Sequence, residues 1–164
     1  MHNHPNCAAA LAAGLAVICP TLLWAATKTA TFNVTAQIIA DCTITVSNLD
    51  FGNVPLLTAT VSGQTNISVT CTNGSGYNVG LDAGNAAGST ITNRIMKSGA
   101  NSLQYKLCSD SARTVNWGNT VGTDTVAGTG NSTAQTLPIY GLLPVQTTPP
   151  VGAYTSMVTA TITF

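Results

Sequence analysis

The sequence predicts an all-β protein with the fold of an immunoglobulin-like antiparallel β-sandwich. Three observations predict it. Apolar and polar residues alternate with a period of two in most segments after residue 28, Gly-rich turns separate these segments, and no segment there has a sustained helical period. Thr, Ser, Asn and Gly dominate the composition, which favours strands and turns. A chain of 164 residues fits one such domain.

The charge content excludes several classes of function. Five basic and five acidic residues give a net charge of zero, and only 6% of the residues are charged. Nucleic acid is excluded as a partner because five scattered cations do not form a basic face. The only histidines are His2 and His4, and there is no Glu. We therefore expect no enzyme activity, no catalytic or metal-binding residues, no cofactor and no small-molecule substrate.

The first segment, residues 1–26, is predicted as a signal peptide. Residues 8–18 form an apolar run, Pro20 breaks it, and Ala25 and Ala26 are the small residues after which cleavage is expected. The chain would then be exported, which predicts an oxidising compartment. A retained membrane anchor is the alternative, since the uncharged run is almost long enough to span a bilayer.

The second segment, residues 27–40, is predicted to contain one long strand. Its apolar residues occupy alternate positions and its intervening residues are polar. These apolar residues are Ala30, Phe32, Val34, Ala36 and Ile38. A tight hairpin usually has Gly or Asn at its turn, and the two residues that follow, Ala40 and Asp41, are neither. We therefore expect this strand to project by about 30 Å, at about 3.3 Å per residue. Pairing within its own domain is the alternative.

Further strands are expected along residues 41–164, separated by Gly, Asn and Pro clusters. They are residues 42–46, 67–71, 77–81, 103–107, 137–143 and 154–164. Pro138 and Pro144 predict that their segment lies at a sheet edge or is bulged, because proline cannot donate a ladder hydrogen bond.

Three cysteines follow the predicted signal peptide, and in an oxidising compartment two of them can pair. Cys42 and Cys71 each lie in an alternating segment, which suits a bridge between adjacent strands. Cys108 is expected to be a buried, unreactive thiol within a strand.

The last strand predicts an unfinished sandwich. The chain ends on it, so nothing follows to cover its edge. It would flank an apolar groove through Tyr154, Val158, Ala160, Ile162 and Phe164. A projecting strand together with an open groove predicts head-to-tail assembly by strand addition, which does not close on itself and makes fibres.

Several motifs in their order resemble the spore coat protein U domain family, which includes subunits of archaic (Csu-type) chaperone–usher pili. The resemblance covers nearly all of residues 27–164. The motifs are Asp41-Cys42-Thr-Ile, Leu49-Asp50-Phe51-Gly52-Asn53-Val54, Ile67-Ser-Val-Thr-Cys71-Thr, Arg94-Ile-Met96, Leu103-Gln-Tyr105-Lys-Leu107, Trp117-Gly118, Ile139-Tyr140-Gly141 and Gly152-Ala-Tyr154 with Val158-Thr-Ala-Thr-Ile-Thr-Phe164.

The resemblance implies a sandwich that lacks its last strand, over residues 41–164, and an N-terminal donor strand, over residues 27–40, that fills a neighbouring subunit's groove. It implies a periplasmic chaperone, an outer-membrane usher and a final place on the cell surface. It also implies a Cys42–Cys71 disulfide and gives the donor role to the five alternating apolar residues. The chain departs from the family pattern at Cys108, where an aromatic is common, and at Ser156, where Asp is common.

These observations predict a structural subunit of a surface pilus that serves adhesion or biofilm formation. A secreted spore-coat or matrix protein with the same domain is one alternative. A monomeric carbohydrate-binding sandwich, with Tyr105, Trp117 and Tyr140 on its binding surface, is another. We expect these aromatics to pack in the core, and the aspartates, such as Asp82 and Asp110, to cap turns rather than to form a catalytic pair.

Overall fold

The computed structural model describes residues 25–164, so nearly all of the predicted signal peptide lies outside the described residues. The chain divides into two units, one that ends at Ala36 and one that spans residues 37–164. No strand is assigned to residues 25–41, and their side chains are exposed. A strand is defined by hydrogen bonds to a partner, so the strand expected at residues 27–40 stays a prediction. No helix within residues 25–164 is long and apolar enough to cross a membrane.

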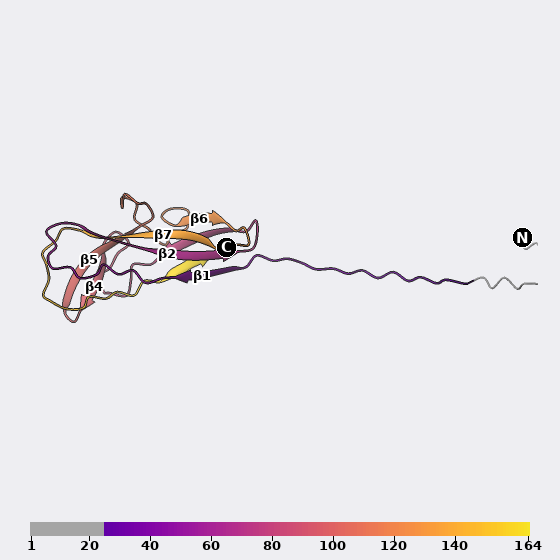
Figure 1. Cartoon of the computed structure of the whole chain (residues 1–164), viewed down its shortest axis with the longest axis horizontal. Coiled ribbons are helices and arrows are strands. Elements are labelled where there is room, and N and C mark those ends of the chain that lie inside the picture. Colours follow the sequence, from indigo (N-terminus) through magenta and orange to yellow (C-terminus); the bar gives the residue numbers. More distant parts are fainter. Residues whose placement is uncertain (1–24) are drawn as a thin grey trace, which may run out of the picture. The chain divides into compact units, whose positions relative to one another are not determined.

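Residues 37–164 form the β domain (Figure 1). Eight strands are assigned in this part of the chain. They are β1 (Cys42–Val46), β2 (Val61–Cys71), β3 (Gly76–Leu81), β4 (Arg94–Ser98), β5 (Asn101–Cys108), β6 (Val126–Thr129), β7 (Gln135–Leu143) and β8 (Ala160–Thr163).

The strands form two antiparallel sheets. The first has the order β1-β2-β7-β5-β4 and the second has the order β6-β3-β8. A bridge between Lys97 of β4 and Thr155 connects the first sheet to the chain that leads into β8. β1 and β8 are edge strands that each pair with a single neighbour, and they contact each other without pairing. The two sheets are therefore joined by pairing at β4, whereas the side between β1 and β8, which we call the unpaired side, has no ladder in the described part of the chain.

Both sheets contribute to one hydrophobic core, as the alternation predicts for a sandwich. Ile67 and Val69 of β2 and Val79 of β3 have no exposed surface. Trp117 is 1% exposed and donates its indole N–H to the Val79 carbonyl at 2.8 Å. The aromatic side chains of Tyr105 and Trp117 are thus core residues, as expected, whereas Tyr140 is only half-buried and lies under the Arg113 guanidinium.

The disulfide that the family resemblance implies is present. Cys42 and Cys71 are directly opposite in the β1–β2 ladder and are bonded to each other. The bridge closes a loop of 29 residues. Because it lowers the conformational entropy of the unfolded chain, it stabilises the fold by about 3–4 kcal/mol. Cys108 is a free, fully buried thiol at the end of β5, as expected, and burial raises its pKa.

Three expectations about strands need correction. The sequence did not predict β4 or β6, because both are short and lack a clear alternation. The terminal strand is shorter than residues 154–164, since only Ala160–Thr163 pairs continuously with β3. The segment with Pro138 is part of a central strand, β7, which lies between β2 and β5. Proline is tolerated there because β5 pairs only with residues 140–142 of β7, so Pro138 has a partner strand on one side alone.

One charged side chain is fully buried in the core. Arg94 has no exposed surface and binds four backbone carbonyls, those of Leu81, Asp82, Ile91 and Trp117, at 2.6–3.1 Å. Burial lowers the pKa of Arg94, and the nearby Tyr105 and Asp82 oppose that shift. Arg94 therefore joins β4 to the end of β3 and to the Trp117 segment, and so positions the strands beneath the unpaired side of the sandwich.

Replacing Arg94 with Met should lower the free energy of unfolding by about 3–5 kcal/mol, because four backbone carbonyls lose their donors, two of them in buried hydrogen bonds. Urea unfolding measures the change. Lys97→Met on the same strand is the control, and it should cost less than about 1 kcal/mol since the Lys97 side chain is half-exposed. Equal losses for the two variants would show that the carbonyl bonds of Arg94 do not hold the core together.

Candidate functional site

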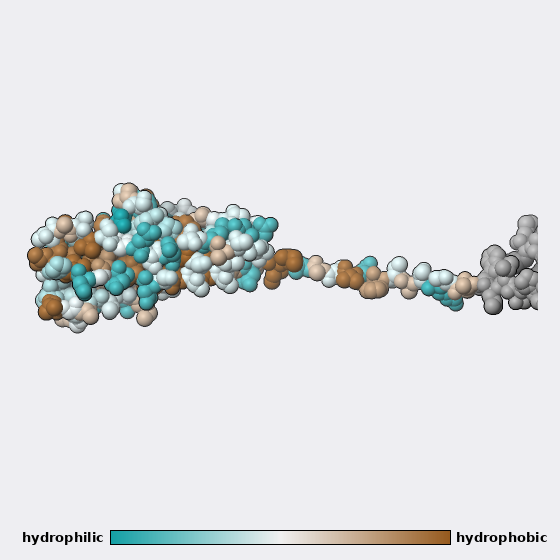
Figure 2. All heavy atoms as spheres, viewed as in Figure 1, coloured by the Kyte–Doolittle hydropathy of each residue, from teal (hydrophilic) through white to brown (hydrophobic). Residues whose placement is uncertain are grey.

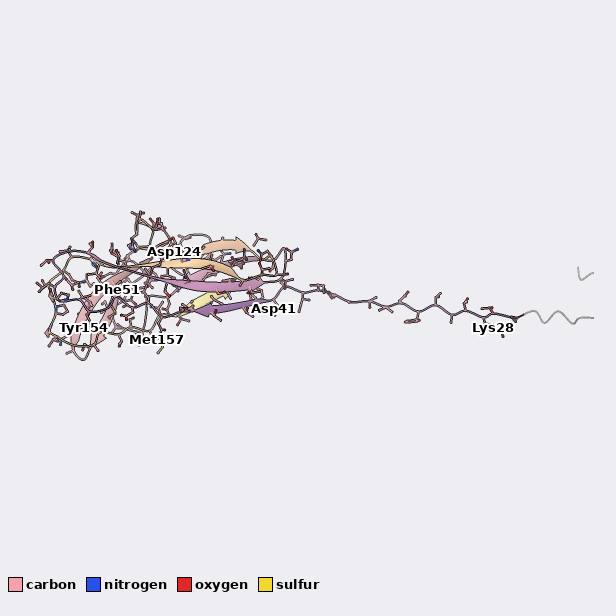
Figure 3. The ribbon with its side chains drawn as sticks, viewed as in Figure 1. Lys28, Asp41, Phe51, Asp124, Tyr154 and Met157 are labelled. Atoms are coloured by element: carbon pink, nitrogen blue, oxygen red, sulfur yellow. A yellow bond between two sulfur atoms is a disulfide. The ribbon has the colours of Figure 1, made fainter. Side chains whose placement is uncertain are left out.

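The main surface feature of the domain is a groove along its unpaired side. It consists of two adjoining hollows of about 760 and 630 Å³. Both hollows are lined by Leu49, Asp50, Phe51, Met96 and Tyr154, so they form one continuous depression, which we call the edge groove. In Figure 3, Phe51 and Tyr154 lie at the same end of the domain.

The first wall of the edge groove is the chain that follows β1, from Val46 to Val54. Its position depends on two glycines that face each other in the β2–β7 ladder, Gly63 and Gly141. A Cβ on Gly141 would lie 2.8 Å from a Leu49 methyl and 2.9 Å from the Phe51 ring, and one on Gly63 would lie 3.2 Å from Phe51. Because glycine has no side chain, the two residues leave a shallow depression on the face of the sheet, and Leu49 and Phe51 pack into it.

A tight turn completes this wall. The Asp50 carboxylate accepts a hydrogen bond from the Gly52 N–H at 2.8 Å. Gly52 has a φ of +69°, a conformation that favours glycine. The Leu49-Asp50-Phe51-Gly52 motif therefore has a structural role, because it anchors two apolar side chains and turns the chain along the groove.

The second wall is the C-terminal segment, residues 154–162. Its even-numbered residues are half-buried and its odd-numbered residues are exposed, which is the strand period, although only its last part pairs as β8. Thr155, Met157 and Thr159 make backbone hydrogen bonds toward Lys97, Asn85 and Asp82. No backbone partner is found for Ser156 or Val158 within residues 25–164. Because backbone groups alternate sides along a strand, these free groups lie on the edge that faces away from β3 and β4.

Two polar side chains hold this second wall in place. The Asp82 carboxylate accepts hydrogen bonds from the Gly84 N–H at 2.9 Å and the Thr159 N–H at 3.0 Å. The Asn85 side-chain oxygen accepts one from the Met157 N–H at 3.0 Å. Burial of Asp82 would raise its pKa, but these hydrogen bonds and the nearby Arg94 charge outweigh burial, so the pKa is lowered. The ionised carboxylate therefore stabilises the wall.

The floor of the groove is apolar except at one point. Leu81, Leu107 and Ile139 line it, and the Tyr105 hydroxyl donates a hydrogen bond to the Ser156 side chain at 2.9 Å. Burial raises the pKa of Tyr105, so this phenol stays neutral. Ser156, the departure from the family pattern, thus has a clear partner. The hydrogen-bonded Tyr105–Ser156 pair is therefore a polar point in the lining of the groove.

The chemistry of the edge groove suits a bound strand. Most of its lining residues are aliphatic or aromatic, polar groups contribute a comparable share of the lining surface, and Asp50 is the only carboxylate among the lining residues. Asp82 and Asp110 cap turns, as expected: the Asp110 carboxylate accepts hydrogen bonds from the Thr114 and Val115 N–H groups, at distances from 2.8 to 3.1 Å. Within residues 25–164 no group of three potential metal-ligating side chains is found.

The structure places the predicted site residues in two groups. Tyr154, Val158 and Ala160 line the edge groove, and Ile162 is half-buried next to the core. Phe164 is 55% exposed and lies beyond the hollows. The predicted donor side chains are all exposed, with Phe32, Val34 and Ile38 between 83% and 85%. Figure 2 shows hydrophobic side chains at intervals along that segment. Sequence reasoning missed the Gly63–Gly141 pair and Asn85; Gly141 lies in a predicted strand, but Gly63 lies before the predicted strand 67–71, so no signal pointed to the pair.

The fold and the groove together define a class: immunoglobulin-like sandwiches in which one strand position is open. The sequence profile of the Spore Coat Protein U domain matches residues 28–161. The chain belongs to this family. No curated protein matches the sequence.

Among solved structures, the fold is similar to a chain in the crystal structure of the CsuC–CsuE chaperone–tip adhesion subunit pre-assembly complex, from archaic chaperone–usher Csu pili of Acinetobacter baumannii. The TM-score is 0.58 and the sequence identity is 23%. The match covers 77% of this chain and 40% of that chain, so this chain spans less than half of the length of its structural relative.

Because the pKa of Asp82 is lowered, we expect its contribution to the free energy of unfolding to decrease at acidic pH. Its stabilising effect is complete above the ordinary carboxyl pKa of 3.8 and is lost as the pH falls through the lower folded value. Asp82→Asn should therefore be less stable than the wild type at pH 7, and the difference should shrink below about pH 4. Urea unfolding at pH 7, 4 and 3 measures it. Asp41→Asn, whose carboxylate is exposed, is the control; a pH-independent difference for Asp82→Asn would contradict the role of its charge.

Proposed function

We propose that the protein is a structural subunit of a surface pilus, assembled by donor-strand complementation. The observation that carries the proposal is the edge groove, which has an apolar floor and a wall with free backbone groups at Ser156 and Val158. A strand laid in this groove would cover the apolar floor and pair those backbone groups at the same time. Family membership and the fold shared with a chaperone-bound pilus subunit support it.

The occupant that fits is residues 28–38 of a second copy. This segment has the strand alternation, its apolar side chains are exposed, and no partner strand is assigned to it. Burying Phe32, Val34 and Ile38 would contribute about 5–9 kcal/mol, at about 1.5–3 kcal/mol for each large side chain. Ordering the segment costs part of that gain. Each copy has one donor segment and one groove, so the contact repeats head to tail and makes a fibre.

The geometry of the walls favours one direction and one register. Val46 and Ala160 line one hollow, while Pro55 and Gly152 line the other, so the two walls run in opposite directions. A donor antiparallel to the C-terminal segment makes the stronger type of ladder. In the register that pairs Val34 with Val158, every even-numbered donor residue faces an even-numbered, half-buried wall residue.

In this register Ala30 and Phe32 each face a residue of contrasting size. Ala30 meets Ile162 of β8. Phe32 meets Ala160, at the start of the hollows. Ala36 meets Ser156, where the Tyr105 hydroxyl occupies the floor. Ile38 meets Tyr154, which lines both hollows.

We propose that a periplasmic chaperone holds the groove before assembly and that an outer-membrane usher receives the complex, after export directed by residues 1–26. A chaperone strand could be replaced by a subunit strand without ATP if the second fit is better. The pilus would lie on the cell surface and serve adhesion or biofilm formation. The few charges of the chain, 6% of its residues, suit close packing of subunits.

Replacing Phe32 and Val34 together with Asp should abolish polymers, because two carboxylates would enter an apolar groove. The measurement is electron microscopy of cells that co-express the chain with its chaperone and usher. The matched control replaces Thr31 and Asn33 with Asp, which adds the same charge on the outward face and should leave polymers intact. Polymers that persist in the first variant would rule out donor-strand complementation and favour a coat, matrix or carbohydrate-binding role.

The register predicts a specific crosslink. With Val34→Cys and Val158→Cys in one chain, oxidation should give a ladder of disulfide-linked oligomers on a non-reducing gel, since directly opposed Cα atoms lie about 5.5 Å apart. Val34→Cys with Ala160→Cys, two residues out of register, should give no ladder. The reverse result would place the donor two residues further along the groove.

A further inference from the structure

Hydrogen bonds at the start of β1 fix the position of the preceding residues, 39–41. Asp41 comes directly before β1 and is labelled in Figure 3. The Asp41 N–H donates a hydrogen bond to the Thr72 hydroxyl oxygen at 3.1 Å, and the Thr72 N–H donates to the Asp41 carbonyl at 2.9 Å. The Thr72 hydroxyl lies 3.3 Å from the carbonyl oxygens of both Ile39 and Asp41, to either of which it can donate. We call this set of contacts the exit clamp.

The exit clamp keeps residues 39–41 in line with β1. Cys42 and Cys71 are opposed and covalently joined, and the Asp41–Thr72 contacts continue their register by one step. The Cys42 N–H also donates a hydrogen bond to the Asp41 carboxylate at 2.9 Å, which restricts rotation of the Asp41 side chain. A chain held in line with β1 leaves the domain at the Cys42 end, whereas the edge groove begins past the other end of β1, at Val46.

A competing state exists for any chain with both a donor segment and a groove, because the chain can fill its own groove. To do so the segment must turn back beside β1. A two-residue turn at Ala40–Asp41 would pair Gln37 with Ile44, and paired residues share a face. Ile44 is half-buried against the core, so Gln37 and Thr35 would face the core side while Ile38 and Ala36 faced solvent. That turn is therefore excluded by register.

A three-residue turn over Ile39, Ala40 and Asp41 would restore the register. Such turns generally place one residue at positive φ, and none of these three is Gly or Asn. The turn would also break the contacts of Thr72 with Ile39 and Asp41. Self-filling therefore has to overcome both the turn and the exit clamp, whereas filling by a second copy disturbs neither.

We propose that Thr72 is a positioning residue that directs the donor segment to a neighbouring copy by opposing the self-filled monomer. This inference rests on the proposed function and concerns which groove the segment enters, that of its own chain or that of a neighbour. The Thr72 hydroxyl has this role because it contacts both Ile39 and Asp41. The disulfide next to it keeps that hydroxyl at the exit of the chain.

Hydrogen exchange of residues 30–38 in the isolated monomer tests the proposal. The exported chain is purified without a chaperone, and monomers and polymers are separated by size. Thr72→Val keeps the shape of the side chain and loses the hydroxyl, so the ratio of self-filled to open monomer should rise about fivefold, the effect of one typical hydrogen bond on an equilibrium, and exchange of this segment in the monomer should slow. Polymer formation should slow as the open fraction falls. Thr72→Ser should restore the wild-type behaviour.

Thr43→Val is the matched control. The Thr43 hydroxyl bonds to the Thr70 carbonyl across the same strand pair, and it does not touch the exit. This variant should exchange and polymerise as the wild type does. Asp41→Gly supplies a turn residue without removing Thr72, and it should also increase the self-filled monomer, so the test does not depend on the folding of one variant.

Two failures can be told apart. If residues 30–38 are protected in wild-type polymers but stay unprotected in Thr72→Val and Asp41→Gly monomers, the role of Thr72 is wrong and the proposed function stands. If the segment is unprotected in wild-type polymers too, or no polymers form at any concentration, the groove does not take this segment and both proposals are wrong.

Discussion

An unpaired strand edge beside an apolar interior is the constraint on which the structure depends. The wall at residues 154–160 uses its odd-numbered backbone groups to bind the sandwich, and its even-numbered groups at Ser156 and Val158 have no partner in the described chain. The same even-numbered side chains border an apolar floor. Free backbone groups and uncovered apolar surface are each unfavourable, and a single added strand satisfies both.

The groove stays open because specific contacts fix the position of each wall. Asp82 and Asn85 bind the C-terminal wall from one side, and Arg94 fixes the strands beneath it through four carbonyls. The opposite wall is set by the shallow depression at Gly63 and Gly141 that receives Leu49 and Phe51. An apolar groove without such supports would tend to collapse on itself. Here the few charged residues of the chain are concentrated where they position backbone.

Much of the fold could be predicted because the alternation of apolar and polar residues is a local signal. The cores of β2, β3, β5 and β7, and the whole of β1, lie where the period of two placed them. β4 and β6 were missed because both are short and their sequences lack a clear alternation of apolar and polar residues. The sequence could not predict that Pro138 lies in a central strand. Pro138 is tolerated there because β5 does not extend alongside it, and the length of that pairing depends on how the sheet assembles.

The sequence by itself determined the fold class, the Cys42–Cys71 pair through its family resemblance, and the alternating residues of segment 27–40 and of the last strand. These features follow from side-chain periodicity and motif order, which a linear pattern records. Only the tertiary structure decided that Tyr154, Val158 and Ala160 border one groove with Leu49 and Phe51, and that Thr72 binds residues 39 and 41 at the exit of the chain. Such contacts join residues that are 31 or more positions apart, and their distances depend on how two sheets pack.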